Sequence, residues 1–270
     1  MADKARLSLN QMTTANWSAQ QAVEGCLRHG IGSIALWRHK IQEAGVEVCV
    51  RLVRDAGVHV SSLCRGGMFP APTEQQRRKN IEDNFRAADE AAALGADSLV
   101  MVVGGCGGLH LEEARKMVAD GIAALVPYAR ERGVRLGLEP LHPMYAADRS
   151  VLNTIDQALE MASHYDAGEV GLILDAFHIW WDPRVADSIA QAAGRIYGFH
   201  ACDWLNPLPD VLLGRGLMGD GVIDNRGLRL LVERAGYNGP IEVEIFNQAL
   251  WDANPDTVLA QVIERFEKFV

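Results

Sequence analysis

The sequence has little that would direct the chain to a membrane, to an oxidising compartment or to nucleic acid. No apolar run approaches the roughly 20 residues of a membrane-spanning helix, and the first residues, Met-Ala-Asp-Lys-Ala-Arg, do not form the apolar core of a secretory signal. The five cysteines form no Cys-x-x-Cys pair, which is typical of a reducing compartment. A net charge of −9 lacks the basic excess that nucleic-acid phosphates attract. We therefore expect a cytoplasmic protein with neither a membrane nor a nucleic-acid partner.

The glycine signatures of nucleotide-binding folds are missing as well. No Gly-x-Gly-x-x-Gly follows the first predicted strand, which argues against a doubly wound dinucleotide-binding sheet. The glycine-rich segment at 104–108 follows the fourth predicted strand and lacks the Gly-Lys-Ser/Thr of a phosphate-binding loop. We interpret it as a loop that needs positive φ angles or approaches a ligand closely.

The chain does contain a regular alternation of short apolar segments and amphipathic segments, with no low-complexity linker between them. The apolar segments predict strands at 6–10, 33–36, 58–63, 98–103, 134–138, 170–174, 195–199 and 240–245. The main predicted helices are 18–29, 46–56, 73–94, 111–132, 151–164, 225–235 and 255–269. Eight strands alternating with helices predict a (β/α)8 TIM barrel, formed by residues 1–270 as a single domain.

Four of the predicted strands end in a polar side chain of the kind that binds metal or transfers protons. Glu139, Asp175, His200 and Glu244 stand at the carboxyl ends of strands five to eight. Any one of them alone would more often be a helix cap, a surface residue or a structural histidine. The carboxyl ends of barrel strands form one rim, where active sites lie, so four successive endings of this kind predict a site.

Three carboxylates and one imidazole suit a hard or borderline divalent ion. We expect one divalent cation per chain, Mn²⁺ before Mg²⁺ or Co²⁺, with Zn²⁺ as an alternative that more often takes nitrogen- or sulfur-rich sites. Without a cation, the crowded carboxylates would repel and raise one another's pKa. Strand alternation places Glu242 and Glu244 on the same face. We select Glu244 because it lies nearer the carboxyl end, but periodicity alone leaves both open.

The second half of the chain resembles a known superfamily. The segments that carry the resemblance are Gly-Leu-Glu-Pro-Leu-His-Pro (137–143), Leu-Asp-Ala-Phe-His (174–178), Gly-Phe-His-Ala-Cys-Asp (198–203), Gly-Asp-Gly-Val-Ile-Asp (219–224) and Gly-Pro-Ile-Glu-Val-Glu-Ile-Phe (239–246). Together they are similar to the xylose isomerase-like sugar isomerases and epimerases, which include ketose 3-epimerases, hydroxypyruvate isomerase, and inosose isomerases and dehydratases. Their order and spacing are fairly specific for the superfamily and not for a substrate.

The resemblance implies roles for named residues. Glu139, Asp175, His200 and Glu244 would be the metal ligands, and Glu139 and Glu244 would also be the catalytic acid and base on opposite faces of the substrate. His178 and Arg215 match positions that contact substrate oxygens. The implied reaction is isomerisation or epimerisation of a small sugar or keto-polyol through a cis-enediolate. The superfamily also implies a homodimer or homotetramer, although no residue pattern indicates the contact face.

Several further residues near the predicted strand ends each allow two interpretations, as substrate contacts or as structural residues. His142 could orient the substrate or cap the loop after Glu139. Trp37 and Trp181 could form aromatic walls of a sugar site or pack loops together. Arg65, after the third strand, would indicate a carboxylate or phosphate on the substrate if it faced inward, but we expect it to face solvent.

Other functions remain as alternatives. The same proton abstraction serves a lyase, dehydratase or decarboxylase acting on an inosose, an oxidised glycoside or a 3-oxo sugar acid, and the fold does not choose among these. A barrel endonuclease would need more histidine ligands and a basic face. A non-catalytic sugar-binding barrel would tolerate glutamine at positions 139 and 244.

Overall fold

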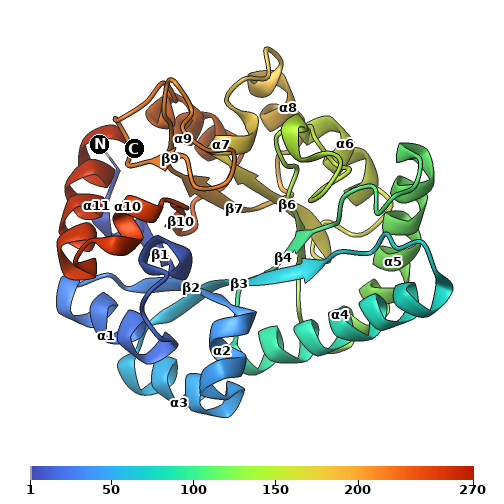
Figure 1. The fold of residues 1–270 in the computed structure, drawn as a ribbon, viewed down its shortest axis with the longest axis horizontal. Helices are drawn as coiled ribbons and strands as arrows, with labels where there is room; N and C mark the ends of the chain where they lie inside the picture. Colours follow the sequence, from blue (N-terminus) through green and yellow to red (C-terminus); the bar gives the residue numbers. More distant parts are fainter. Residues whose placement is uncertain (1) are drawn as a thin grey trace.

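The computed structural model describes residues 2–270 and confirms the TIM barrel. Eight parallel strands close in the order β1-β10-β7-β6-β5-β4-β3-β2 (Figure 1). These strands are β1 (Leu7–Asn10), β2 (Ser33–Trp37), β3 (His59–Gly67), β4 (Leu99–Val102), β5 (Leu136–Leu138), β6 (Val170–Asp175), β7 (Ile196–Ala201) and β10 (Ile241–Val243). Each of the eight predicted strands therefore has its counterpart.

Helices surround the barrel on its outside (Figure 1). They are α1 (Ala19–His29), α2 (Arg38–Ala44), α3 (Val46–Ala56), α4 (Glu74–Leu94), α5 (Leu111–Glu131), α6 (Ile155–Ala162), α7 (Ala176–Ile179), α8 (Val185–Gln191), α9 (Asn225–Arg234), α10 (Gln248–Asp252) and α11 (Pro255–Phe269). Their apolar faces bury a continuous core against the strands. The short helices α2, α7, α8 and α10 were not predicted, because one or two turns carry too little periodicity to recognise.

The inside of the barrel is filled by a few large side chains that require small neighbours. Ile173 packs there with Val100 and Tyr197. A Cβ atom on Gly137 would lie 2.6 Å from Cγ1 of Ile173, and one on Gly198 would lie 2.9 Å from its Cδ1. Glycine on the flanking strands β5 and β7 therefore makes room for Ile173, and this packed layer forms part of the barrel interior.

Two regions differ from the sequence prediction. Helix α6 begins at Ile155 and not at 151, because the Thr154 side chain accepts the Gln157 N–H and caps the helix there. The long connection after β7 contains an antiparallel pair, β8 (Asp203–Trp204) and β9 (Arg215–Gly216). This hairpin matters for function because it delivers Arg215 to the rim.

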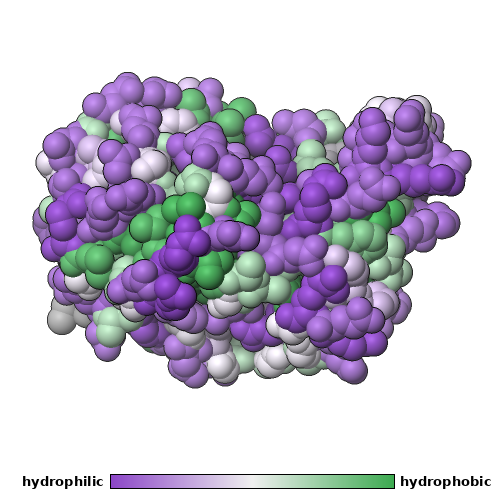
Figure 2. Space-filling view, turned by 90° about the horizontal axis from the view of Figure 1, so that it is seen from below, coloured by the Kyte–Doolittle hydropathy of each residue, from purple (hydrophilic) through white to green (hydrophobic). Residues whose placement is uncertain are grey.

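The surface is mostly polar. On the face in Figure 2, hydrophilic residues surround a smaller apolar area. Large apolar side chains that are exposed among the described residues include Leu27, Val48, Met68, Val211, Val222 and Leu230. Across residues 2–270, the helices lack the combination of length and apolar character that spanning a membrane demands.

Candidate metal centre and active site

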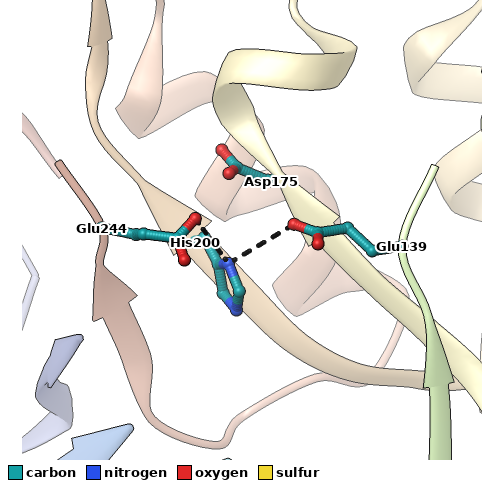
Figure 3. A group of neighbouring side chains, drawn as sticks. All are labelled: Glu139, Asp175, His200 and Glu244. Carbon is teal, nitrogen blue, oxygen red and sulfur yellow. Dashed lines mark ion pairs between the residues drawn. The ribbon is translucent and has the colours of Figure 1, made fainter. Parts of the chain in front are cut away.

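The four strand-end residues meet in one buried cluster (Figure 3). Glu139 directly follows β5, Asp175 ends β6, His200 lies in β7 and Glu244 directly follows β10. One potential ligand atom from each residue lies within 4.8 Å of those of the others. None of the four residues is more than 5% exposed. The barrel thus brings together side chains that are far apart in the sequence.

His200 occupies the middle of the cluster. Its Nδ1 lies 3.8 Å from Oε1 of Glu139 and 3.6 Å from Oε2 of Glu244, and no hydrogen bond forms at this buried nitrogen within residues 2–270. Burial opposes protonation of the ring, but the charges of Glu242 and Glu244 outweigh it and raise the pKa of His200 well above 6.5. A nitrogen in this position is available to a cation that would replace the proton.

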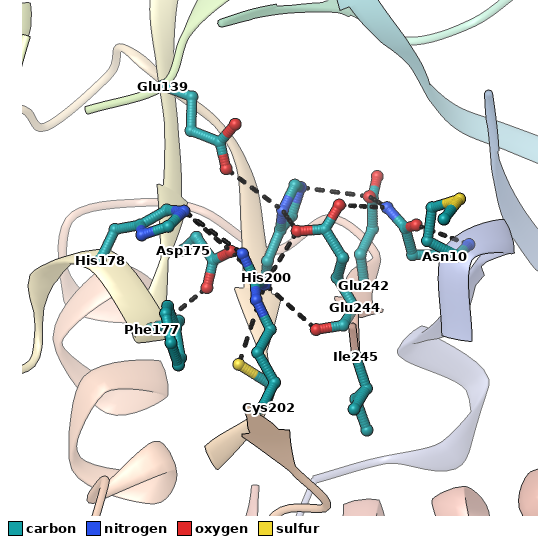
Figure 4. Close-up of polar contacts among 12 residues, drawn as sticks. Asn10, Glu139, Asp175, Phe177, His178, His200, Cys202, Glu242, Glu244 and Ile245 are labelled. Atoms are coloured by element: carbon teal, nitrogen blue, oxygen red, sulfur yellow. Dashed lines mark hydrogen bonds and ion pairs between the residues drawn. The ribbon is translucent and has the colours of Figure 1, made fainter. Parts of the chain in front are cut away.

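Glu242 and Glu244 take different places although they share a face of the strand (Figure 4). Glu244 points into the cluster, and its Oε1 accepts a 3.0 Å hydrogen bond from the Asn10 side chain. Glu242 lies on the other side of the imidazole, with its Oε2 3.1 Å from Nε2 of His200. Its Oε1 accepts a 2.9 Å hydrogen bond from the Ser61 hydroxyl. The geometry therefore separates two residues that the sequence pattern could not.

Arg215 places a permanent positive charge beside the metal-free cluster. Its Nη1 donates to Oδ2 of Asp175 at 2.7 Å and to Oε2 of Glu244 at 2.9 Å. Its Nη2 lies 3.3 Å from Nε2 of His178. The guanidinium is centred 4.7 Å from the Phe177 ring and 5.1 Å from the Phe246 ring, a geometry typical of cation–π contacts. Arg215 is thereby fixed beside both carboxylates.

The two glutamates differ in their electrostatic surroundings. Burial, followed by the charge of Glu244, raises the pKa of Glu139 to about 8. Burial also opposes ionisation of Glu244, but Arg215 and His200 outweigh it and lower the Glu244 pKa below 4.5. In the metal-free protein at neutral pH, Glu139 is therefore largely protonated and Glu244 is ionised.

The metal-free protein is expected to lose stability as the pH rises towards 8. The pKa of Glu139 increases from its ordinary value of 4.5 to about 8 on folding, so the folded chain keeps a proton that the unfolded chain releases. The resulting stabilisation is complete below pH 4.5 and is lost as the pH passes through about 8. Urea unfolding in EDTA across this pH range measures it. The variant Glu139→Gln should show a flatter pH dependence, and an unchanged slope would contradict the assignment.

A cavity of about 320 Å³ opens above the cluster, a size at the lower end of small-molecule sites. Three of the predicted substrate-binding residues, Trp37, His178 and Arg215, line it together with Glu139 and Glu244. The other lining residues are Cys64, Arg65, Met68, Val102, Leu141, Tyr145, Asp148, Arg149, Leu212 and Phe246. The cavity therefore gives a small molecule access to both glutamates.

His142 and Trp181 do not line this cavity, and their contact with a substrate stays a prediction. Nδ1 of His142 accepts the Met144 N–H at 3.2 Å and caps the short 3₁₀ turn Pro143–Tyr145. The His142 and Trp181 rings lie 5.5 Å apart, centre to centre. The Trp181 indole donates to the His178 carbonyl at 2.8 Å. Both side chains thus hold loops in place.

The cavity also contains side chains that the sequence did not reveal. Tyr145 and Arg149 belong to the irregular segment after β5, where no periodicity predicts direction. Arg65, expected in solvent, is only partly exposed and lines the cavity. Its place directly after a predicted strand was the only available signal.

Comparison with solved structures shows close likeness over the whole chain. Protein SMc04130 from Sinorhizobium meliloti 1021 superposes with a TM-score of 0.96 and 47% sequence identity, over 99% of each chain. The IOLI protein, in a structure with a bound zinc atom, has a TM-score of 0.85 and 21% identity over 98% of this chain and 99% of that one. At that identity the second likeness shows the fold alone.

The curated relatives are enzymes. A 3-dehydroshikimate dehydratase from Pseudomonas aeruginosa is 32% identical over 205 residues, which are 73% of this chain and 31% of that protein. An inosose isomerase from Bacillus subtilis is 29% identical over 139 residues, 50% of this chain and 48% of that protein. This chain thus spans less than half the length of either relative. The family model for the xylose isomerase-like TIM barrel matches residues 23–269, and the chain belongs to that family.

Proposed function

We propose that the protein is a divalent-metal-dependent isomerase or epimerase of a small sugar or keto-polyol. The observation that supports this best is the placement of Glu139 and Glu244. Their carboxylates point toward one another from the two sides of His200 (Figure 3), and both line the cavity. Two carboxylates that face one small cavity can remove a proton from one side of a substrate and return one to the other side.

The donor set fits a divalent cation. Three buried carboxylates converge on an imidazole nitrogen that lacks a hydrogen bond within the described chain, and this mixture of oxygen and nitrogen donors suits Mn²⁺, Mg²⁺ or Co²⁺, with Zn²⁺ as the alternative. Glu139, Asp175, His200 and Glu244 would hold the ion. When bound, it would supply positive charge beside the substrate oxygens and acidify the neighbouring C–H bond. Glu242 would orient His200 through Nε2.

Two other polar residues of the cavity, His178 and Arg215, would donate hydrogen bonds to substrate oxygens. Burial lowers the pKa of His178 to about 3, so its ring is neutral at physiological pH. Its Nδ1 is buried without a partner among residues 2–270 and could bond a substrate oxygen. Arg215 remains charged, and its guanidinium would stabilise negative charge that develops on the substrate when the proton leaves carbon.

A dehydratase is the second candidate, and the likeness to 3-dehydroshikimate dehydratase favours it. Removal of the same proton, followed by departure of a hydroxyl group from the adjacent carbon, would release water and not return the proton to carbon. The residues described above would serve either outcome, because they act before the two reactions diverge.

Metal analysis followed by turnover in D₂O tests the proposal. We expect one divalent ion per chain and metal-dependent conversion of a ketose or keto-inositol. Solvent deuterium should appear at the epimerised or isomerised carbon of a product with otherwise unchanged mass. A product that has lost water would identify the dehydratase instead. If no divalent ion binds at saturating concentration, both candidates fail.

A further inference from the structure

Arg65 reaches the cavity because of an irregularity in β3. Neighbouring residues of a regular strand point to opposite faces, yet Cys64 and Arg65 both line the cavity. The register with β4 steps from Cys64 opposite Val100 to Gly66 opposite Met101, which leaves Arg65 as an extra residue. Such a bulge redirects a side chain, and bulges are frequent beside active sites.

Arg65 has no counter-ion of its own within residues 2–270. The contrast is Arg38, which follows β2 and hydrogen bonds Asp83 at 2.7 Å and also Glu90. No carboxylate of the described chain makes an ion pair with Arg65, although it is only partly exposed. Its charge is therefore available to something that enters the cavity.

The second cation, Arg149, belongs to the loop after β5. The glycine-rich segment 104–108 hydrogen bonds to this loop and packs against it. The Gly104 N–H donates to the Arg149 carbonyl at 3.0 Å. A Cβ atom on Gly105 would lie 2.5 Å from the Ala147 carbonyl oxygen and from the Asp148 nitrogen. The glycine-rich segment was predicted to need positive φ angles or to approach a ligand closely, and φ is positive at Gly104, Gly107 and Gly108. Its close approach is to this loop, and it fixes the backbone from which Arg149 extends.

The Arg149 side chain is also incompletely paired. Its Nε is buried and lacks a hydrogen-bond partner in the described chain. Oδ2 of Asp148 lies 3.6 Å from it, but the Asp148 side chain is 64% exposed, so water and salt screen that attraction. The Arg149 side chain is itself 40% exposed, whereas the four clustered residues are almost fully buried. Arg149 therefore lies on the solvent side of the site.

The charges of the side chains that line the cavity do not cancel. In the cluster, a divalent ion and Arg215 would offset the three carboxylates of Glu139, Asp175 and Glu244. The carboxylate of Glu242 lies on the other side of His200 and does not line the cavity. On the solvent side, the two arginines face one lining carboxylate, that of Asp148, which leaves one positive charge in excess. Guanidinium groups bind carboxylates and phosphates in a forked geometry.

We infer that the substrate carries an anionic group, a carboxylate or a phosphate, which Arg65 and Arg149 bind while its oxygens at the reacting carbons face the buried cluster. This inference rests on the proposed function, because it places the anion on the same molecule that Glu139 and Glu244 deprotonate. It narrows the substrate from a neutral sugar to a small hydroxylated carbonyl acid or phosphate.

Calorimetric titration of the Mn²⁺-loaded protein with three matched chelators tests this. Catechol, 3,4-dihydroxybenzoate and 3,4-dihydroxyphenylphosphonate share vicinal oxygens that chelate a divalent ion, and they differ in one substituent. We expect an anionic probe to bind about 10-fold or more tightly than catechol, since hydrogen bonds between charged groups are strong. The tighter of the two anionic probes identifies carboxylate or phosphate.

The double variant Arg65→Met/Arg149→Met should lose this preference while its catechol affinity and metal content stay unchanged. Arg65→Lys/Arg149→Lys, which keeps the charges, should retain much of it. The control Arg51→Met/Arg54→Met removes two exposed charges from α3 and should retain all of it. Equal affinity for the three probes, or an unchanged preference in the methionine variant, would overturn the inference. Failure of the wild type to bind metal would instead overturn the proposed function, and the inference with it.

Discussion

Replacing either Glu139 or Glu244 by glutamine is expected to lower turnover by about 10²- to 10⁴-fold, the usual contribution of a general acid or base. Glutamine preserves the size of each side chain but cannot exchange a proton. Because both residues belong to the ligand cluster, metal content has to be measured in parallel and turnover compared at saturating metal. The control Glu267→Gln changes an exposed residue of α11 and should keep wild-type turnover.

Isotope exchange distinguishes the two glutamates from each other. The variant that lacks the base should neither form product nor exchange the substrate C–H with D₂O. The variant that lacks the acid should still exchange that hydrogen while product formation falls, because proton removal remains intact on one face. If both metal-loaded variants turn over at the wild-type rate, the assignment of the acid/base pair is wrong.

Replacing Arg215 by methionine is expected to destabilise the metal-free protein by about 3–5 kcal/mol at pH 8, as the loss of one partner from a buried ion pair does. The Arg215 guanidinium bonds Asp175 at 2.7 Å and Glu244 at 2.9 Å. Methionine would leave Asp175 buried without its cation and Glu244 with only His200 beside it. The free energy of unfolding in urea measures the loss.

Two further conditions separate this electrostatic effect from a packing defect. The loss of unfolding free energy in Arg215→Met should be smaller at pH 5, where protonation can neutralise carboxylates that have lost their cation. It should also be smaller at pH 8 after addition of Mn²⁺. Arg215→Lys should be destabilised less than Arg215→Met because it keeps the charge. A methionine variant as stable as the wild type in EDTA at pH 8 would contradict the proposed role of Arg215 in the metal-free site.

The sequence predicted the barrel and the buried cluster because both depend on the same simple pattern. The apolar run before Asp175 ends abruptly in a carboxylate, and the same holds before Glu139. In a parallel barrel this position alone places a side chain on the rim. The order of the barrel strands then brings β5, β6, β7 and β10 together as neighbours. The cluster could therefore be predicted without any prediction of loop structure.

The rest of the site depends on irregular backbone, which periodicity does not describe. Arg65 lines the cavity from a bulge in β3, and strand alternation had given no reason to expect this. Arg149 is placed by hydrogen bonds between two loops. His142 belongs to a segment of the same kind, where the turn after Glu139 directs its Nδ1 to the Met144 N–H. Side-chain direction in irregular segments is therefore the part of the site that the sequence pattern does not predict.

The closure of the barrel also determines when the site can exist during synthesis. Asn10 on β1 bonds both Glu242 and Glu244, across 232 and 234 residues. Neither contact can form until the last barrel strand, β10, pairs with β1. The cluster is therefore incomplete until residue 244 has emerged from the ribosome. A nascent chain shorter than this holds Glu139, Asp175 and His200 without Glu244, the third carboxylate of the cluster. Metal binding at this site would accordingly require that the last barrel strand, β10, has been synthesised and has joined β1.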